Sequence, residues 1–397
     1  MVNFEYYTPT KVIFGKDTQN RVGELAKAYG ASKVLVHFGG GSVVRSGLLE
    51  QVLKSLDEAG VPHVELGGVV PNPRLSKVYE GIELCKKEGV DFLLGVGGGS
   101  VIDSCKAIGY GLCYDGDVWD IISQQVVPTA CAPIASVVTL AAAGSEMSNS
   151  CVITKEETGE KRAINNDVSR PKFAILNPEL TYTLPPYQTA SGCVDIMSHT
   201  LERYFSDGGD VMLTDGIAEA LLKTIMVMSK RALENPEDYE ARANIMWAGS
   251  LSHNNLTGSG RGKGGRAGDW ACHQLEHELS GMYDVAHGAG LAAVWGGWSR
   301  YVMPECPDRF ARFARNVMGV KLEGTDEEVA LAGIEAFEDF LRSIHMPTTI
   351  REMGIELTDE IIDQLAWMCT FKGKRTIGAF KVLELEDIKK VYHMAKG

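Results

Sequence analysis

Residues 92–100 read FLLGVGGGS, a five-residue apolar run that leads directly into three glycines and a serine. A short apolar run bounded by glycines predicts a strand that is buried on both faces. Similar runs alternate with amphipathic segments from about residue 20 to residue 184. They predict strands at 33–38, 61–66, 92–96, 128–140 and 173–176, and helices at 24–29, 47–59 and 75–88. Strands separated by helices are typical of a parallel sheet with helices on both faces.

The sequence pattern changes at Pro185-Pro186, a pair that can begin a helix but cannot continue a strand. Beyond it we expect long helices, at 187–205, 211–234, 239–254, 270–282, 288–302, 308–318 and 329–344, with two more from 359 and from 386. A chain of 397 residues exceeds what one hydrophobic core usually serves. We therefore predict an α/β domain at residues 1–185 and an all-helical domain at residues 186–397.

The composition is that of a globular protein, with 45% hydrophobic and 23% charged residues. The 52 acidic residues outnumber the 39 basic ones, and the net charge of −13 argues against nucleic acid as a partner. The nine cysteines form no C-x-x-C pair, which favours a reducing compartment, so we expect a cytoplasmic protein. We expect no signal peptide and no membrane span, because the N-terminus lacks the required pattern and no uncharged apolar stretch reaches about 18 residues.

Two predicted strands end in the same turn, Gly-Gly-Gly-Ser, at residues 39–42 and 97–100. Glycines there let the backbone approach a ligand closely, and the N–H groups that open the following helix attract an anion. Ligands of open α/β sheets gather at the carboxyl ends of the strands. We therefore expect a pyrophosphate beside Gly97–Ser100, with Asp103 accepting a hydrogen bond from a ribose or a nicotinamide. The turns match neither the G-x-G-x-x-G fingerprint nor the P-loop.

The first turn bears on the choice between NAD(H) and NADP(H). Enzymes that select NAD commonly place a carboxylate against the 2′-hydroxyl of the adenine ribose. After Phe38 the chain has glycines, Ser42 and, close by, Arg45, with no acidic residue. That leaves room for a 2′-phosphate bound by Ser42 and backbone N–H groups, and it favours NADP(H).

Four residues of the helical half have the chemistry of metal ligands. Asp195 and His199 are four residues apart, so on a helix they share a face. Two further helices can bring His273 and His287 to the same point, and one carboxylate with three imidazoles suits Fe²⁺ or Zn²⁺. A single histidine is more often an internal hydrogen-bonding residue, so the inference rests on the whole set together with the Gly-rich turns. Cys272 diverges from His273 by about 100° on a helix and is not expected to be a ligand.

His277 lies one helical turn after His273 and is the candidate catalytic residue. We expect it to relay a proton or to contact the cofactor ribose, and a hydrogen bond to a metal ligand is an equally open alternative. Glu276 and Glu278 point elsewhere on the helix and are expected to be solvated or in surface ion pairs. His253 is given no role.

Gly97–Asp103 and the four candidate ligands together resemble the iron-containing, or group III, alcohol dehydrogenases. Further strings match that family, namely PTKVIFG at 9–15, PNP at 71–73, TL at 139–140, GSE at 144–146, LNP at 176–178, DIMSH at 195–199, the stretch 273–280 and TIG at 376–378. The resemblance spans essentially the whole chain. It is nearest to the butanol dehydrogenase and broad-range aldehyde reductase branch, where Gly-Gly-Gly-Ser also follows the first strand.

The resemblance implies a Rossmann-like parallel-sheet N-terminal domain and an all-α C-terminal domain, an architecture shared with dehydroquinate synthase. It also implies a dinucleotide in the cleft, a homodimer, and metal ligation by Asp195, His199, His273 and His287. Cofactor contacts carry over to Gly40, Ser42, Gly99, Ser100, Asp103, Thr139 and Lys161, and Gly98 belongs to the same turn as Gly99. His277 matches a family histidine that lies near the site and is not a ligand.

Two features depart from the family pattern. Ala143 stands where the family often has Thr before Gly-Ser-Glu, which removes one hydroxyl contact to the cofactor. The loop 258–268, GSGRGKGGRAG, is longer and richer in Gly and Arg than the family norm. We expect this loop either to reshape the substrate entrance or to pack at the subunit interface.

Three functions compete. The first is a metal-dependent NAD(P)(H) alcohol dehydrogenase or aldehyde reductase for short primary alcohols and aldehydes, such as butanol and butanal. We favour this function because the segments around the candidate ligands are mostly apolar or neutral. A lyase resembling dehydroquinate synthase would need several Lys and Arg for a phosphate-bearing substrate. A structural metal site without catalysis would generally use Cys ligands.

Overall fold

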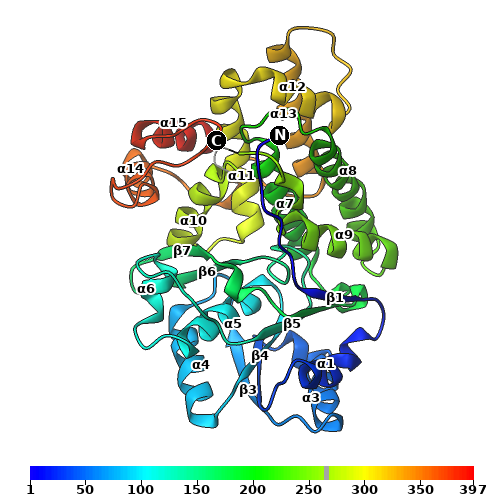
Figure 1. Ribbon diagram of the computed structural model, residues 1–397. Helices are drawn as coiled ribbons and strands as arrows, with labels where there is room; N and C mark the ends of the chain where they lie inside the picture. Colours follow the sequence, from blue (N-terminus) through cyan, green and yellow to red (C-terminus); the bar gives the residue numbers. More distant parts are fainter. Residues whose placement is uncertain (263–267) are drawn as a thin grey trace. The chain divides into compact units, whose positions relative to one another are not determined.

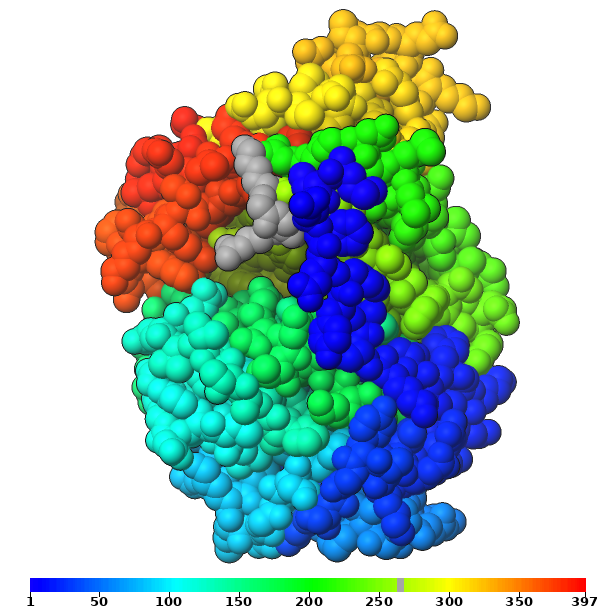
Figure 2. Space-filling model, viewed as in Figure 1, coloured from blue at the N-terminus to red at the C-terminus, as the bar shows by residue number. Residues whose placement is uncertain are grey.

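The computed structural model describes residues 1–262 and 268–397, which form two compact units (Figure 1). One unit comprises Tyr7–Leu184, and the other comprises Pro185–Gly397 together with Met1–Tyr6. The predicted N-terminal domain included the first six residues. They belong with the helical unit instead, where the backbone N–H of Val2 donates to the carbonyl oxygen of Gly260 at 2.9 Å. This N-terminal segment lies at the surface (Figure 2, dark blue).

The first unit is built on a parallel sheet, as predicted, and the sheet has six strands in the order β1-β8-β5-β4-β2-β3. The strands are β1 (Lys11–Phe14), β2 (Val34–Gly39), β3 (His63–Val69), β4 (Phe92–Gly97), β5 (Ile134–Val138) and β8 (Phe173–Leu176). Phe38 of β2 pairs with Val96 of β4, and Gly97 of β4 pairs with Val138 of β5. The two Gly-rich turns and the loop after β5 therefore leave neighbouring strands at the same edge of the sheet.

Helices cover both faces of this sheet (Figure 1). They are α1 (Val22–Ala28), α2 (Ser42–Arg45), α3 (Leu48–Glu58), α4 (Leu75–Glu88), α5 (Gly99–Leu112) and α6 (Val118–Ile122). Alternate residues of a strand face opposite sides. Val34 and Val36 of β2 pack with α1 and α3, whereas Leu35 packs with α4 and α5. Because both faces are covered, the strands read as continuous apolar runs.

Some strands differ from the prediction. β5 is shorter than the predicted 128–140, and β1 was not predicted. An antiparallel hairpin, β6 (Ser150–Lys155) and β7 (Glu160–Asn165), stands apart from the main sheet and was also missed. Its second strand reads EKRAIN, in which Lys161 and Arg162 are buried. Charged residues at buried positions conceal the alternation on which strand prediction depends.

The second unit is helical in its described part, as predicted, apart from an isolated bridge between Ile377 and Leu383. Its helices are α7 (Pro186–Tyr204), α8 (Met212–Glu234), α9 (Tyr239–Ser252), α10 (Ala271–Tyr283), α11 (His287–Val302), α12 (Pro307–Asn316), α13 (Asp326–Ser343), α14 (Asp359–Cys369) and α15 (Leu385–Ala395). Among the described residues, no helix is both long and apolar enough to cross a membrane.

Helix α7 is the central element of the helical unit. Every residue from Thr189 to Tyr204 is buried, and α8, α9 and α11 pack around the helix. Helix α7 is therefore buried on all sides, so its polar side chains lie in the interior, where each needs a partner.

Candidate metal centre

Helix α7 presents Asp195 and His199 on one face, as their spacing predicts. The helix begins at Pro186, where proline fits the first turn. Both residues lie in its buried run, with 4% and 3% of their surface exposed. Nε2 of His199 lies 3.6 Å from Oδ1 of Asp195. The helix thus holds a carboxylate and an imidazole close together in the interior, although both groups would otherwise be hydrated by water.

His273 and His287 reach the same point from two other helices. His273 lies in the first turn of α10, and His287 is the first residue of α11. Their Nε2 atoms lie 3.9 Å and 3.7 Å from Oδ1 of Asp195. One carboxylate oxygen therefore faces three ring nitrogens, at separations too long for hydrogen bonds. The structure brings all four predicted ligands together.

The arrangement fits a metal cation. Oδ1 of Asp195 and Nε2 of His273 are buried and have no hydrogen-bond partner among the described residues, which costs about 1–3 kcal/mol for each such atom. Donor atoms about 2.1 Å from a tetrahedral cation lie about 3.4 Å apart, close to the three separations measured from Asp195. The donors of Asp195, His273 and His287 all lie within 4.8 Å of one another. His199 lies next to this group, because its Nε2 is 3.6 Å from Oδ1 of Asp195.

The electrostatic surroundings of the centre shift the pKa values of His199 and His273 in opposite directions. Burial lowers the pKa of His199 well below its ordinary value, and the neighbouring rings of His253 and His273 add to the effect. Burial also opposes charge on His273, but the carboxylates of Asp195 and Glu202 outweigh it and raise the pKa of His273 to about 9. The centre therefore favours added positive charge beside Asp195, while His199 stays neutral, as a ligand must.

Two buried glutamates contact the histidines of the centre, and neither contact was predicted from the sequence. Oε1 of Glu202 accepts hydrogen bonds from Nδ1 and from the backbone N–H of His273, at 2.9 and 3.0 Å. Oε2 of Glu276 bonds to Nδ1 of His287. The prediction that Glu276 and Glu278 are solvated or in surface pairs is wrong, because they are only 0% and 4% exposed. Helical spacing offers the missed signal, since each contacting glutamate lies three residues after a candidate ligand.

The N-terminus of α10 is built to hold His273. Trp270, the residue before this helix, has a φ of +63°, which is uncommon for a residue other than glycine, and its side chain does not cap the helix. Asp269 accepts a hydrogen bond from the N–H of Ala271 at 3.1 Å. With Glu202, it places two carboxylates at the positive end of the helix. Burial and the charge of Glu202 raise the pKa of Asp269 to about 7.

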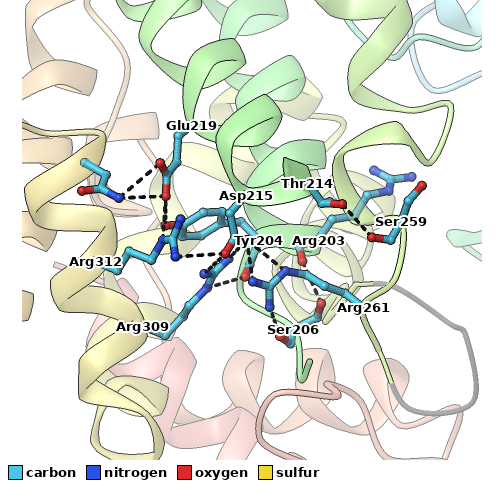
Figure 3. Close-up of polar contacts among 11 residues, drawn as sticks. Arg203, Tyr204, Ser206, Thr214, Asp215, Glu219, Ser259, Arg261, Arg309 and Arg312 are labelled. Carbon is cyan, nitrogen blue, oxygen red and sulfur yellow. Dashed lines mark hydrogen bonds and ion pairs between the residues drawn. The ribbon is translucent and has the colours of Figure 1, made fainter. Parts of the chain in front are cut away.

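An ionic network fixes the turn after α7 and the start of the loop 258–268 (Figure 3). Asp215 of α8 accepts hydrogen bonds from Arg261 at 2.5 Å and from Arg309 of α12 at 2.7 Å. Arg261 also donates to the carbonyl oxygen of Ser206 at 3.2 Å. The start of this loop is therefore tied into the helical unit. Residues 263–267 lie outside the described residues, so the roles expected of the loop at the substrate entrance or the subunit interface stay predictions.

His277 lies close to the centre. Its ring centroid is 5.8 Å from that of His287, and donor atoms of Glu276, His277 and His287 lie within 4.8 Å of one another. His253, for which no role was predicted, stacks on the ring of His199 with centroids 3.9 Å apart. Cys272 belongs to neither group of candidate donors found among the described residues.

The Gly-rich turns of the α/β unit follow β2 and β4. At the second turn, a Cβ on Gly99 would lie 2.8 Å from the Cβ of Ala143, so this turn packs tightly on the loop after β5. Helix α5 then begins with no side-chain cap and no acidic residue in its first turn, which suits an anion. At the first turn Gly40 and Ser42 are exposed. The φ of +115° at Gly41 favours glycine there.

Asp103 and Lys161 are held by internal contacts. The carboxylate of Asp103 accepts hydrogen bonds from the hydroxyl of Ser145 at 2.5 Å and from the N–H of Val152 at 3.0 Å. Nζ of Lys161 donates to Oδ1 of Asn72 at 3.0 Å. Burial raises the pKa of Asp103. Both residues connect separate segments of the α/β unit, in addition to the cofactor contacts expected of them.

Comparison with known proteins agrees with this chemistry. A family model described as iron-containing alcohol dehydrogenase matches residues 9–178, and a model of the C-terminal part of the Fe-containing alcohol dehydrogenase family matches residues 189–396. NADH-dependent butanol dehydrogenase A from Clostridium acetobutylicum is 41% identical over 99% of both chains. NADPH-dependent aldehyde reductase YqhD from Escherichia coli is 34% identical over 100% of both chains.

A solved structure, that of NADH-dependent butanol dehydrogenase A from Thermotoga maritima, is 42% identical with a TM-score of 0.95 and covers 100% of this chain and 99% of that one. The protein is therefore an oxidoreductase, and the first of the three competing functions, alcohol dehydrogenase or aldehyde reductase, is confirmed. A metal and an NAD(P) cofactor follow from the same relationship. On matches that together run from residue 9 to residue 396, the chain belongs to the iron-containing alcohol dehydrogenase family.

Proposed function

We propose that this enzyme interconverts short-chain primary alcohols and aldehydes, such as butanol and butanal, with a divalent metal and NAD(P)(H). The observation that carries the proposal is the buried Oδ1 of Asp195, which faces the ring nitrogens of three histidines and finds no hydrogen-bond partner in the part of the chain that the structure describes. The substrate class is supported by relatives named butanol dehydrogenase at 41% and 42% identity.

We assign the metal to Asp195, His199, His273 and His287. Fe²⁺ is in keeping with the family name, and Zn²⁺ is the alternative, since imidazole and carboxylate donors suit both. A bound divalent cation supplies the positive charge that stabilises negative charge developing on the substrate oxygen. Burial of Asp195, His199 and His273 keeps bulk water from these side chains, which strengthens the electrostatic interactions among them.

His277 is proposed to relay the proton that the substrate oxygen gains or loses when hydride is transferred. Its ring lies 5.8 Å from that of His287. The alternatives are a contact to the cofactor ribose and a hydrogen bond to a metal ligand. His277→Ala separates them: a relay predicts a lower kcat with a changed pH profile, a ribose contact predicts a higher KM for the nicotinamide cofactor, and a ligand contact predicts weaker metal binding.

We propose that the α/β unit binds the dinucleotide through its Gly-rich turns and the segments beside them. The contacting residues are Gly40, Ser42, Gly98, Gly99, Ser100, Asp103, Thr139 and Lys161. The uncapped start of α5 supports a pyrophosphate at the second turn.

NADP(H) is proposed as the preferred cofactor. No carboxylate follows Phe38 in the first turn, and Arg45 lies against it, since its Nη1 would be 3.1 Å from a Cβ on Gly41. The names of relatives point both ways, because those from Clostridium acetobutylicum and Thermotoga maritima specify NADH and that from Escherichia coli specifies NADPH. The ratio of kcat/KM for NADPH and NADH decides the question.

One assay tests the activity. Enzyme loaded with Fe²⁺ or Zn²⁺ is mixed with butanal and either NADPH or NADH, and the absorbance of the reduced nicotinamide is followed. We expect consumption that stops when a chelator strips the metal and returns when metal is restored. No consumption with either cofactor, across short aldehydes and in reverse with short alcohols, would defeat the proposal.

We also propose a homodimer in the cytoplasm. Strand β1 forms an edge of the sheet, and both its last residue, Phe14, and Tyr7 before the strand are exposed, as expected for a surface that meets a second subunit. Among the described residues no cysteine forms a disulfide, which suits a reducing compartment. Light scattering that gives the monomer mass of 43.1 kDa would contradict the dimer.

A further inference from the structure

We infer that Glu202 and Glu276 are positioning residues of the metal centre, each holding one histidine so that its Nε2 atom faces Asp195. This inference rests on the proposed metal site and deepens it. The carboxylates would not touch the metal. They would act through His273 and His287, by fixing which ring nitrogen carries the proton and how each ring is turned.

Glu202 fixes the orientation of the His273 ring through two hydrogen bonds. It lies on α7, one turn after His199, and is 3% exposed. Its Oε1 accepts hydrogen bonds from both Nδ1 and the backbone N–H of His273, at 2.9 and 3.0 Å. When the ring is neutral and Nδ1 donates to this oxygen, the lone pair of the ring is on Nε2, which points towards Asp195. The same carboxylate therefore fixes the start of α10 and the ring that α10 carries.

Glu276 repeats this arrangement from a different helix. It lies on α10 and is fully buried. Its Oε2 bonds to Nδ1 of His287, and its Oε1 accepts the hydroxyl hydrogen of Ser280. Nε2 of His287, on the opposite side of the ring, lies 3.7 Å from Oδ1 of Asp195. Two carboxylate–histidine pairs thus converge on one oxygen atom.

The first turn of α11 leaves room for this arrangement. A Cβ on Gly290 would lie 2.7 Å from Cγ of Glu276, and a Cβ on Gly288 would overlap the carbonyl oxygen of Ser191 in α7. Glycine at both positions lets α11 approach α7 and α10 closely enough for His287 to reach the centre and for Glu276 to fit behind it. The spacing His-Gly-Ala-Gly at 287–290 is therefore part of the site.

The charge balance of the centre supports the same inference. Asp195, Glu202 and Glu276 place three buried carboxyl groups around the ring nitrogens, and within residues 1–262 and 268–397 Oε2 of Glu202 has no hydrogen-bond partner. Burying negative charge is costly unless positive charge compensates it. A divalent cation beside Asp195 would supply that compensation. The rings of His273 and His287, which bond to the two glutamates, would be polarised by the cation and would donate stronger hydrogen bonds to them. His199 differs, because its Nδ1 has no hydrogen-bond partner in the same described ranges and its ring stacks on His253.

The test is metal affinity rather than turnover. Glu202→Gln and Glu276→Gln keep the size of each side chain and an acceptor oxygen but remove the charge. Zn²⁺ affinity of the metal-stripped enzyme is measured by competition with a chromophoric chelator. Each variant is expected to bind Zn²⁺ about 10- to 100-fold more weakly than the wild type. Gly290→Ala, which crowds Glu276, is expected to weaken binding in the same direction.

Glu338→Gln is the matched control. Glu338 is also a buried glutamate of the helical unit, but its carboxylate pairs with Arg300, with Oε2 and Nη2 2.8 Å apart. Its substitution removes a buried charge without contact to a candidate ligand, so Zn²⁺ affinity is expected to be unchanged. The visible absorption of bound Co²⁺ provides a second readout, because it reports coordination geometry. It should change in Glu202→Gln and Glu276→Gln and stay the same in Glu338→Gln.

The outcomes separate this inference from the proposed function. Suppose the wild type binds a single Zn²⁺ and Asp195→Ala abolishes that binding. If both glutamine variants then keep wild-type affinity and the wild-type Co²⁺ spectrum, the positioning role is overturned and the metal site stands. If the wild type itself binds no Zn²⁺ or Co²⁺, both fail together.

Discussion

Lowering the pH from about 7 to about 5 should destabilise the α/β unit through one buried histidine. His37 lies on β2 and is fully buried, with Nδ1 donating to the carbonyl oxygen of Leu66 at 2.7 Å. Its Nε2 lies 2.9 Å from the hydroxyl of Ser104, which donates to it when the ring is neutral. Burial is the main cause that lowers the pKa of His37 to about 4.

The size of the effect follows from proton linkage. The pKa of histidine in an unfolded chain is about 6.5, so the unfolded state takes up the proton first as the pH falls. The contribution of a neutral His37 to stability is therefore present above about pH 6.5 and is lost between about pH 6.5 and pH 4. At pH 5 the loss amounts to about 2 kcal/mol, and the whole difference between the two pKa values corresponds to about 3.4 kcal/mol.

Urea unfolding at the two pH values, followed by circular dichroism, measures this loss. His37→Asn keeps a donor for the Leu66 carbonyl and cannot be protonated, so it should lose about 2 kcal/mol less than the wild type between pH 7 and pH 5. His393→Asn, at an exposed position of α15, is the control and should behave as the wild type does. Equal losses in the wild type and His37→Asn would refute the conclusion that the fold keeps this histidine neutral.

Three other substitutions probe different parts of the molecule. Asp215→Asn leaves Arg261 and Arg309 without their shared carboxylate (Figure 3), so it should lower the free energy of unfolding by about 3–5 kcal/mol; a melting temperature equal to that of the wild type would contradict this. His287→Ala should abolish turnover while fluorescence titration still detects cofactor binding, and retained activity would count against the ligand assignment. Arg45→Ala should raise the KM for NADPH more than that for NADH, whereas equal effects would remove the argument for NADP(H).

The parallel sheet and the closeness of Asp195 to His199 could be predicted because their sequence patterns are local. The central strands are buried on both faces, so 33–38 and 92–96 read as apolar runs, and Asp195 and His199 are one helical turn apart. His273 and His287 reach that pair only through the packing of separate helices. Their position could be expected only from the four residues taken together and from the family resemblance.

The glutamates that contact the candidate ligands could not be predicted in the same way. A glutamate on an amphipathic helix usually faces solvent, and only the all-round burial of α7 and the close approach of α11 place Glu202 and Glu276 inside. The role of Gly288 and Gly290, which is to let α11 approach its neighbours closely, can be recognised only from the packed helices. The β6–β7 hairpin was missed for a related reason, because buried Lys161 and Arg162 resemble surface residues in sequence.

The central claim is that a single cation is held by residues from three helices of one unit. Anomalous diffraction from crystals of the metal-loaded enzyme, recorded at the absorption edge of iron or zinc, tests it most directly. We expect one strong peak about 2.0–2.2 Å from Oδ1 of Asp195 and from Nε2 of His199, His273 and His287. A peak elsewhere, or no peak in crystals of enzyme shown to be active, would contradict the account.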